Sequence, residues 1–153
     1  MIRYINTPLG TMIAVTDGEA IISLDFTDEV SMNDHSDHPL LLQLEKELGE
    51  YFVGKRASFS LPLNPTGTPF QKSVWNTLIT IAYGQTITYA EEAKRFGNPK
   101  ATRAVANANG RNPIAILIPC HRVIATGGGL GGYSGGIEKK EFLLRLESEK
   151  SSH

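Results

Sequence analysis

Cysteine is the scarcest reactive residue in this sequence, because Cys120 is the only one among 153 residues. A single thiol excludes an intrachain disulfide and a zinc site built from several cysteines, and it fits a reducing compartment. The sequence also lacks an apolar run of about 18 residues, the length that a membrane-spanning helix needs. Its opening, Met1-Ile2-Arg3-Tyr4, has the pattern of a strand and not that of a signal peptide. These absences predict a cytoplasmic protein with no membrane partner.

A strong charge of either sign is missing as well. The chain has 15 basic and 16 acidic residues, and its formal net charge is -1. An overall positive field, which often marks a protein that binds nucleic acid, is therefore excluded. Any binding to DNA must rest on a local basic patch. With 41% hydrophobic residues, the chain can form a real core in one ordinary domain or two small ones.

The N-terminal part predicts a small antiparallel sheet that is followed by a helix. The predicted strands are residues 3–6, 12–15 and 20–26, and in the last of them Ile22, Leu24 and Phe26 alternate with polar residues. Asp17-Gly18 is typical of a hairpin turn between two of them. A helix begins at Pro39, and its leucines recur at helical spacing up to Gly54.

The polar segment between the sheet and this helix contains residues that are common metal ligands. They form the cluster Asp34-His35-Ser36-Asp37-His38. A flexible polar loop offers no fixed coordination geometry, so we expect no metal here.

A change in composition marks the boundary between two predicted domains, residues 1–65 and 66–153. Leu61–Pro69 contains three prolines and one glycine, which neither a helix nor a central strand tolerates. After it, apolar residues recur at helical spacing from Phe70 to Ile81 and are typical of core packing.

Two short helices are predicted next. Thr88-Tyr89-Ala90-Glu91 has the form of a capping box and starts a helix that runs to Phe96. Gly97 suits a left-handed helix end, and Asn98-Pro99 suits the start of a second helix. Such a pair is a candidate helix-turn-helix, although many helical hairpins bind nothing. The second helix combines small residues with cations, and the local basic patch consists of Lys94, Arg95, Lys100, Arg103 and Arg111.

The cysteine follows an apolar segment. Ile114–Ile118 is short and rich in β-branched residues, which predicts a buried strand that Pro119 ends. A lone cysteine often has no chemical role and packs in the core as a small hydrophobic side chain. Here His121 and Arg122 follow it at once, and a base and a cation favour the thiolate. Because successive side chains of an extended segment point to opposite faces, Cys120 and His121 can cooperate only through a turn, a short helix or a bridging water.

A glycine-rich segment and a last helix complete the chain. Residues 127–136 lack the Gly-Lys-Ser/Thr signature of a phosphate-binding loop. This segment is either a pocket wall that carries Tyr133 and Ser134 or a flexible surface loop. A final helix from about residue 137 is expected to turn Phe142, Leu143 and Leu146 inward.

Together these motifs resemble one family. Pro119-Cys120-His121-Arg122-Val123, preceded by Asn112-Pro113 and followed by Gly132-Tyr133-Ser134-Gly135-Gly136, is similar to the pattern of the O6-alkylguanine-DNA alkyltransferases, or methylated-DNA-protein-cysteine methyltransferases. The likeness is specific from about residue 69 to 147. It implies an α+β fold, with an N-terminal antiparallel sheet and helix of ribonuclease H-like form. The C-terminal domain would be mostly helical and hold the helix-turn-helix and the reactive cysteine.

The resemblance also implies a chemistry that needs no cofactor. Cys120 would take the alkyl group from guanine O6 in DNA, with thymine O4 as a second candidate position, irreversibly and once per molecule. His121 would accept the thiol proton through a water, with Glu147 orienting its ring. Asn112 would hold the surrounding turn, and Tyr89 would hydrogen-bond the base.

The resemblance assigns further residues to the DNA. The partner would be double-stranded DNA containing O6-alkylguanine, bound by a monomer in the minor groove. Arg103 would fill the space left by the flipped nucleotide. The groove contact would involve Lys100, Ala101, Thr102 and Ala106. The base pocket would consist of Tyr89, Val123, Tyr133 and Ser134.

Two other functions remain open from the sequence. A non-catalytic protein that only binds the lesion would not need the thiol. A cysteine hydrolase using Cys120 and His121 would turn over repeatedly on an acyl or peptide substrate.

Overall fold

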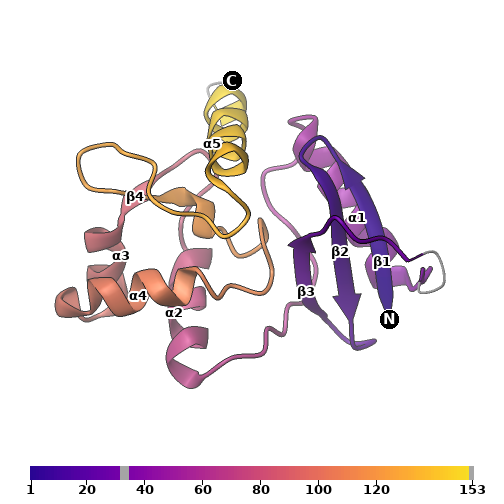
Figure 1. Cartoon of the computed structure of the whole chain (residues 1–153), viewed down its shortest axis with the longest axis horizontal. Helices are drawn as coiled ribbons and strands as arrows, with labels where there is room; N and C mark the ends of the chain where they lie inside the picture. Colours follow the sequence, from indigo (N-terminus) through magenta and orange to yellow (C-terminus); the bar gives the residue numbers. More distant parts are fainter. Residues whose placement is uncertain (32–34, 152–153) are drawn as a thin grey trace. The chain divides into compact units, whose positions relative to one another are not determined.

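The computed structural model describes residues 1–31 and 35–151 (Figure 1). The chain forms two compact units. The first consists of Met1–Thr66 together with the short segment Pro113–Ala115, and the second consists of Gly67–Asn112 and the chain from Ile116 onward. No helix in these described ranges is both long and apolar enough to cross a membrane.

The first unit contains a three-stranded antiparallel sheet in the order β1-β2-β3. Its strands are β1 (Ile2–Thr7), β2 (Gly10–Thr16) and β3 (Ile21–Phe26). The predicted turn lies between β2 and β3, where Gly18 has a φ of 97° and the Asp17 carboxylate accepts from two backbone N–H groups. The predicted antiparallel sheet is therefore confirmed.

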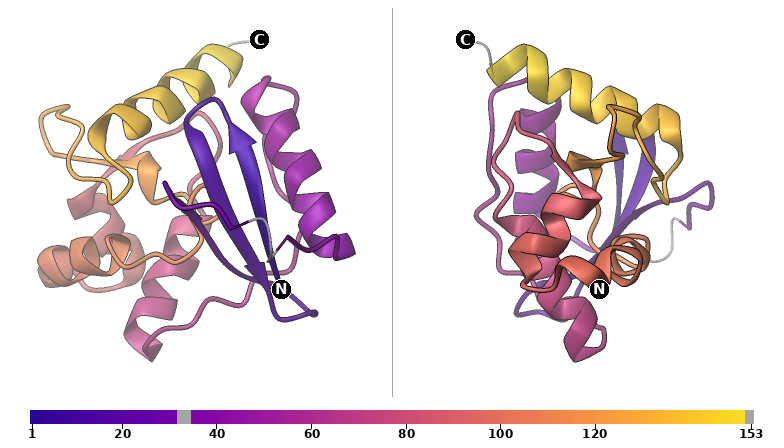
Figure 2. Two further views of the ribbon diagram at one scale, coloured as in Figure 1. Left: turned by 45° about the vertical axis from the view of Figure 1, so that its right-hand side comes forward. Right: turned by 90° about the vertical axis from the view of Figure 1, so that its left-hand side faces the viewer.

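Helix α1 (Pro39–Phe52) packs on this sheet (Figure 2), and its leucines Leu41, Leu44 and Leu48 are fully buried. His38 caps the helix by accepting from the Leu40 N–H.

In the cluster considered for metal binding, Asp34 lies outside the described residues. Asp37 pairs with Arg3 at 2.8 Å. His38 and Asp37 thus have structural roles.

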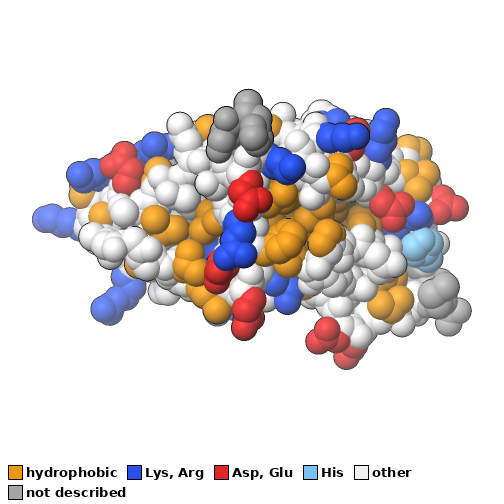
Figure 3. All heavy atoms as spheres, turned by 90° about the horizontal axis from the view of Figure 1, so that it is seen from above, with side chains coloured by type: hydrophobic (Ala, Val, Ile, Leu, Met, Phe, Trp, Pro, Cys, Tyr) orange, Lys and Arg blue, Asp and Glu red, His pale blue; other side chains and the backbone are white. Residues whose placement is uncertain are grey.

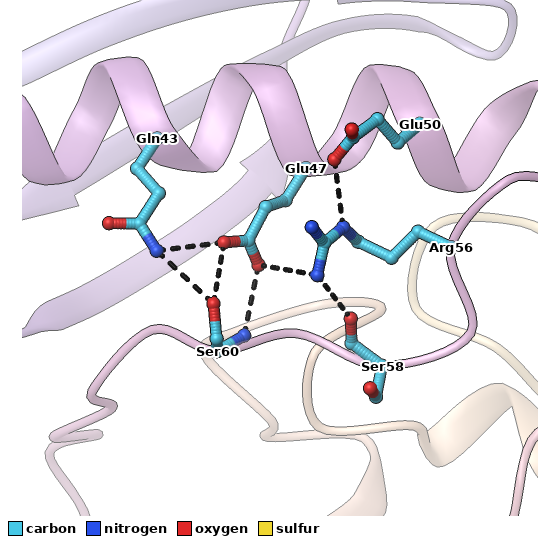
Figure 4. Close-up of polar contacts among 6 residues, drawn as sticks. All are labelled: Gln43, Glu47, Glu50, Arg56, Ser58 and Ser60. Atoms are coloured by element: carbon cyan, nitrogen blue, oxygen red, sulfur yellow. Dashed lines mark hydrogen bonds and ion pairs between the residues drawn. The ribbon is translucent and has the colours of Figure 1, made fainter.

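A polar cluster ties the chain beyond α1 back to the helix (Figure 4). The buried carboxylate of Glu47 accepts from the backbone and hydroxyl of Ser60, at 2.9 and 2.8 Å, and from Gln43 at 2.8 Å. Burial alone would raise the pKa of Glu47, but these hydrogen bonds and the charge of Arg56 lower it. The cluster thus holds the chain around Ser60, just before the proline-rich segment, against helix α1.

The second unit is mostly helical. It contains α2 (Pro69–Ile79), α3 (Tyr89–Phe96), α4 (Thr102–Asn109) and α5 (Ile137–Ser151). Its core joins α2, α3 and α4 through Val74, Ala93, Val105 and Ala108. Trp75 of α2 also donates from its indole to the Ala108 carbonyl at 2.9 Å. With the sheet of the first unit, this gives the predicted α+β fold.

The two predicted helices after residue 88 are confirmed with one difference. Thr88 caps α3 by accepting from the Glu91 N–H, and Gly97 ends it with a φ of 105°. The second helix begins with a 3-10 turn, Pro99–Ala101, capped by Asn98, before α4 continues it.

On the face drawn in Figure 3, basic and acidic side chains are interspersed, as the net charge of -1 suggests.

The predicted strand over Ile114–Ile118 is wrong, although the predicted burial is right. Only Ile114 forms a bridge, with Leu24 of β3, and residues 115–117 form a turn. Ile116 has a φ of 72°, a left-handed conformation that a strand excludes. An apolar run indicates burial but does not determine hydrogen-bond partners. Here the Ala115 N–H donates to the Leu24 carbonyl, and the Ile118 carbonyl accepts from the Asn112 side chain and the Cys120 N–H.

Helix α5 also differs from the prediction at two of the three positions expected to face inward. Leu143 is fully buried, but Phe142 is 36% exposed and Leu146 is only partly buried. The buried face instead contains two charged residues, Lys140 and Glu147, at helical spacing with Leu143. Helical periodicity did not predict these charged residues on the buried face, although the resemblance assigned Glu147 to the site, and both belong to the site described next.

Candidate functional site

Cys120 begins a 3-10 turn, Cys120–Arg122, directly after Pro119. The Asn112 side chain donates to the Ile118 carbonyl at 2.8 Å and to the Cys120 sulfur at 3.3 Å. The Cys120 N–H donates to the same carbonyl at 2.8 Å. The thiol is 8% exposed, so Asn112 and this tight turn hold it almost entirely inside the protein.

A cavity of about 300 Å³ opens at the thiol. It is lined by Tyr89, Ala106, Asn107, Asn109, Gly110, Cys120, Gly132, Tyr133 and Ser134. The structure thus brings four of the residues assigned by resemblance together with the cysteine, namely Tyr89, Ala106, Tyr133 and Ser134. Val123 is not in this lining. Its side chain is fully buried, and its backbone carbonyl accepts a hydrogen bond from Lys140.

Two local features place Tyr89 beside the cysteine. The short strands β4 (Ile87–Thr88) and β5 (Val123–Ile124) pair in parallel, which joins the start of α3 to the end of the cysteine turn. Gly131, with a φ of 75°, approaches the Tyr89 ring so closely that a Cβ there would lie 2.7 Å from the phenol oxygen. The glycine-rich segment is therefore a packed wall of the cavity at this point.

Burial has the largest effect on the pKa of the Cys120 thiol. It raises the pKa of Cys120, while the hydrogen bond from Asn112 and the charge of Lys140 oppose this effect. The resting thiol is therefore protonated at neutral pH, and a base must take its proton before it can act as a nucleophile.

The carboxylate of Glu147 joins the two residues that follow the cysteine. His121 Nε2 lies 2.7 Å from Glu147 Oε2, and Arg122 donates to both carboxylate oxygens, at 2.7 and 3.1 Å. Arg122 also donates to the Ile81 carbonyl at 2.7 Å, which anchors the network to the chain just after α2. Burial alone would raise the pKa of Glu147, but its hydrogen bonds with His121 and Arg122 and the positive charge of Arg122 lower it to about 2. Glu147 is therefore ionised.

This network fixes the tautomer of His121. Burial lowers the pKa of the fully buried imidazole more than its bond to Glu147 raises it, so the ring is neutral at neutral pH. A carboxylate can only accept, so Nε2 carries the hydrogen and Nδ1 is the basic nitrogen. Nδ1 is buried and has no hydrogen-bond partner in the described part of the chain. It is available to take a proton, directly or through water.

Lys140 is a site residue that sequence reasoning missed. Its ammonium is fully buried and donates to the carbonyls of Val123 and Gly132, at 2.6 and 2.9 Å. Burial lowers the pKa of Lys140, whereas negative charge on Cys120 or Glu92 would raise it. Through its two hydrogen bonds, Lys140 links β5 after the cysteine to the cavity wall. Its helical spacing with Leu143 and Glu147 was the signal that could have identified it.

The residues assigned to DNA lie at the start of the second helix. Lys100 and Ala101 belong to the 3-10 turn, and Thr102 and Arg103 begin α4. Lys100 and Arg103 are exposed, whereas Val105 and Ala108 of the same helix face the core. Ala106 lines the cavity, so α4 connects the basic surface to the cysteine pocket.

Comparison with known families agrees with both halves of this arrangement. The ribonuclease-like domain of 6-O-methylguanine DNA methyltransferase matches residues 1–65, and the DNA binding domain of the same family matches residues 69–149. The chain belongs to the 6-O-methylguanine DNA methyltransferase family. The suspected resemblance is thereby confirmed.

Relatives within this family cover nearly the whole chain. A methylated-DNA–protein-cysteine methyltransferase of Methanosarcina acetivorans is 47% identical over 147 residues, covering 93% of this chain and 94% of that protein. The constitutive enzyme of Bacillus subtilis with the same name is 43% identical over 151 residues, with coverages of 93% and 92%. The crystal structure of Mycobacterium tuberculosis OGT in complex with DNA superposes with a TM-score of 0.89 at 41% identity, covering 97% of this chain and 93% of that one.

Proposed function

We propose that this protein is a methylated-DNA–protein-cysteine methyltransferase that repairs DNA by moving an alkyl group from guanine O6 to Cys120. The observation that carries the proposal is the placement of the only thiol in the wall of a cavity that Tyr89 and the glycine-rich segment share. The relatives named for this activity support it, because they match the chain over nearly its full length.

The proposed reaction begins with removal of the thiol proton. His121 Nδ1 takes it through a water molecule, and the ionised Glu147 stabilises the imidazolium that forms. The Cys120 thiolate then attacks the alkyl carbon in line with the bond to guanine O6. A carbon–sulfur bond forms, the carbon–oxygen bond breaks, and the electron pair goes to the purine. A proton returned to the leaving guanine restores the normal base, and Tyr89 hydrogen-bonds the purine as its charge develops.

The thioether that results is stable, so each molecule reacts once. No group in the described site removes the alkyl group from sulfur. The same displacement applies to O4-alkylthymine, which presents an alkyl group on an exocyclic oxygen in a smaller ring. The protein is a stoichiometric reagent in this proposal.

The substrate must leave the duplex to reach the thiol, because the cysteine is buried in a pocket. We infer that Arg103 enters the space left by the extruded nucleotide while α4 lies in the minor groove. Lys100, Ala101 and Thr102 make the accompanying backbone and groove contacts. Base flipping costs a few kcal/mol and least where pairing is already damaged, which favours the lesion. Residues 66–153 would thus carry out binding and transfer as a monomer, with residues 1–65 as the accompanying domain.

Intact-mass measurement tests the proposal directly. Incubation with a duplex that contains O6-methylguanine is expected to add one methyl group per protein molecule, located at Cys120 by peptide mapping. The unmodified duplex is the control and should add nothing. A protein that binds the lesion tightly with no gain in mass would be a lesion sensor, and repeated turnover of an ester with the mass unchanged would indicate a hydrolase.

Methylation is also expected to destabilise the protein. Cys120 is 8% exposed, so a methyl group on sulfur is a small-to-large change in a packed site, which typically costs about 1–3 kcal/mol. The Tm should therefore fall by several degrees on methylation. Differential scanning calorimetry of the fully methylated protein, compared with protein treated with unmodified duplex, measures the shift. A Tm that stays equal or rises would show that the thiol is not closely packed.

A further inference from the structure

A second buried carboxyl group lies next to the cavity and has no role in the mechanism above. Glu92, in the middle of α3, is completely inaccessible to solvent. Its Oε1 accepts a hydrogen bond of 2.7 Å from the side-chain amide of Asn109, at the end of α4. Asn109 is 93% buried and lines the cavity that holds Cys120. A carboxyl group thus supports one wall of the pocket from behind.

The other oxygen of each side chain raises a chemical problem. Glu92 Oε2 and Asn109 Oδ1 are both buried, and neither has a hydrogen-bond partner among the described residues. If Glu92 were ionised, both atoms would be acceptors only, and burying unpaired acceptors is costly. A single proton on Oε2 turns that atom into a donor that can satisfy Oδ1. The carboxylic acid and the amide then pair at two points, and one proton accounts for both orphaned oxygens.

The titratable groups around Glu92 come from its own helix and from two other elements, α5 and the 3-10 turn at Cys120. Lys140 of α5 stabilises the ionised form of Glu92 and lowers its pKa. An ionised Glu92 in turn raises the pKa values of Cys120 in the 3-10 turn and of Tyr89 in α3. Lys140 is already engaged by the Val123 and Gly132 carbonyls. Burial raises the pKa of Glu92 to about 7, against the opposing effects of Asn109 and Lys140.

We propose that Glu92 is a positioning residue that holds Asn109 in the pocket wall as a neutral acid–amide pair and keeps negative charge away from Cys120. The proposal rests on the proposed function of Cys120 as alkyl acceptor. The sign of the effect follows from the electrostatics. Below about pH 7 Glu92 is neutral, and above it the carboxylate raises the pKa of Cys120 and opposes formation of the thiolate.

Glu92→Gln isolates this effect, because glutamine can still accept from the Asn109 amide and donate to its oxygen, yet it cannot ionise. The single-turnover rate of methyl transfer is measured between about pH 6 and about pH 9. Wild type and variant should react equally at the acid end. Above pH 7 the variant should be faster by about 3- to 10-fold, which corresponds to a shift of about half to one unit in the thiol pKa.

Glu91→Gln is the matched control. It makes the same chemical change one residue earlier, where the side chain is 45% exposed and pairs with Arg95 at 3.5 Å. Its pH profile should coincide with that of wild type. Coinciding profiles for Glu92→Gln and wild type would overturn the proposal.

Two further measurements keep the test decisive. Carbon-13 NMR of the assigned Glu92 carboxyl in wild-type protein should show a titration midpoint near 7, and a midpoint in the ordinary acidic range would refute the neutral pair even if the variant failed to fold. If wild type gains no methyl group at any pH, the proposed function fails instead. The rate of Cys120 alkylation by iodoacetamide, compared between wild type and Glu92→Gln over the same pH range, then decides the inference without DNA.

Discussion

Replacing Cys120 with serine is expected to abolish alkyl transfer and to leave binding of the methylated duplex in place. Serine has nearly the volume of cysteine, so the turn that Asn112 holds should persist. The hydroxyl, however, is a far weaker acid than a thiol and a poor nucleophile without a stronger base. A neutral His121 activates a thiol much more readily than an alcohol. The variant should therefore show no gain in mass on a time scale at which wild type reacts completely.

Two assays separate this outcome from simple misfolding. Fluorescence anisotropy with a labelled O6-methylguanine duplex should give a similar Kd for wild type and Cys120→Ser, and the Tm should change little. Methyl transfer to any other residue of the variant would show that Cys120 is not the acceptor. Loss of binding together with loss of transfer would indicate that the thiol is needed for the shape of the pocket, contrary to the proposal.

Removing Glu147 is expected to have the largest effect on stability. The carboxylate is 1% exposed and accepts from His121, from Arg122 twice, and from the Gly84 N–H at 3.4 Å. Glu147→Ala leaves the Arg122 guanidinium buried without its counter-ion, and breaking a buried pair in this way costs about 3–5 kcal/mol. Transfer should also slow sharply, because nothing then fixes Nδ1 of His121 as the basic nitrogen.

The same carboxylate predicts a pH dependence of stability. The pKa of Glu147 is about 2 in the folded protein, against an ordinary value of 4.5. A group whose folded pKa is depressed stabilises the protein above its unfolded pKa, and this contribution disappears as the pH falls through the folded value. Wild type should therefore lose about 3 kcal/mol of stability from this group between about pH 5 and pH 2. Glu147→Ala should lack that part of the acid transition.

Urea unfolding at several pH values measures both effects. Glu141→Ala is the matched control, because it removes a carboxylate from the same helix that is 53% exposed and pairs with Arg145 at 2.8 Å. An exposed pair four residues apart contributes about 0.3–0.5 kcal/mol. If both variants lost equally little stability, the buried network would not contribute as its geometry indicates.

The sequence by itself determined the elements whose signals are local. Short apolar segments around the turn at Asp17-Gly18 defined the three strands, Pro39 and Gly97 marked a helix start and a helix end, and the block from Pro119 to Val123 indicated the family. These signals depend on periodicity, backbone conformation and residue type, all of which can be read within a few positions. The helices of the second unit could be predicted in this way, whereas the turn at residues 115–117 and the pairing of β4 with β5 could not.

Only the tertiary structure decided which polar groups are buried together. Ile114–Ile118 had the composition of a strand, but a bridge at Ile114 and a turn at Ile116 bring Cys120 back toward Asn112. No sequence pattern singled out Lys140 or Glu92, and both are completely buried behind the pocket. Partners separated by 17 residues, such as Glu92 and Asn109 or Lys140 and Val123, leave no local pattern. The protonation state of each group depends on its burial and on the charges next to it, and both arise only when the chain folds.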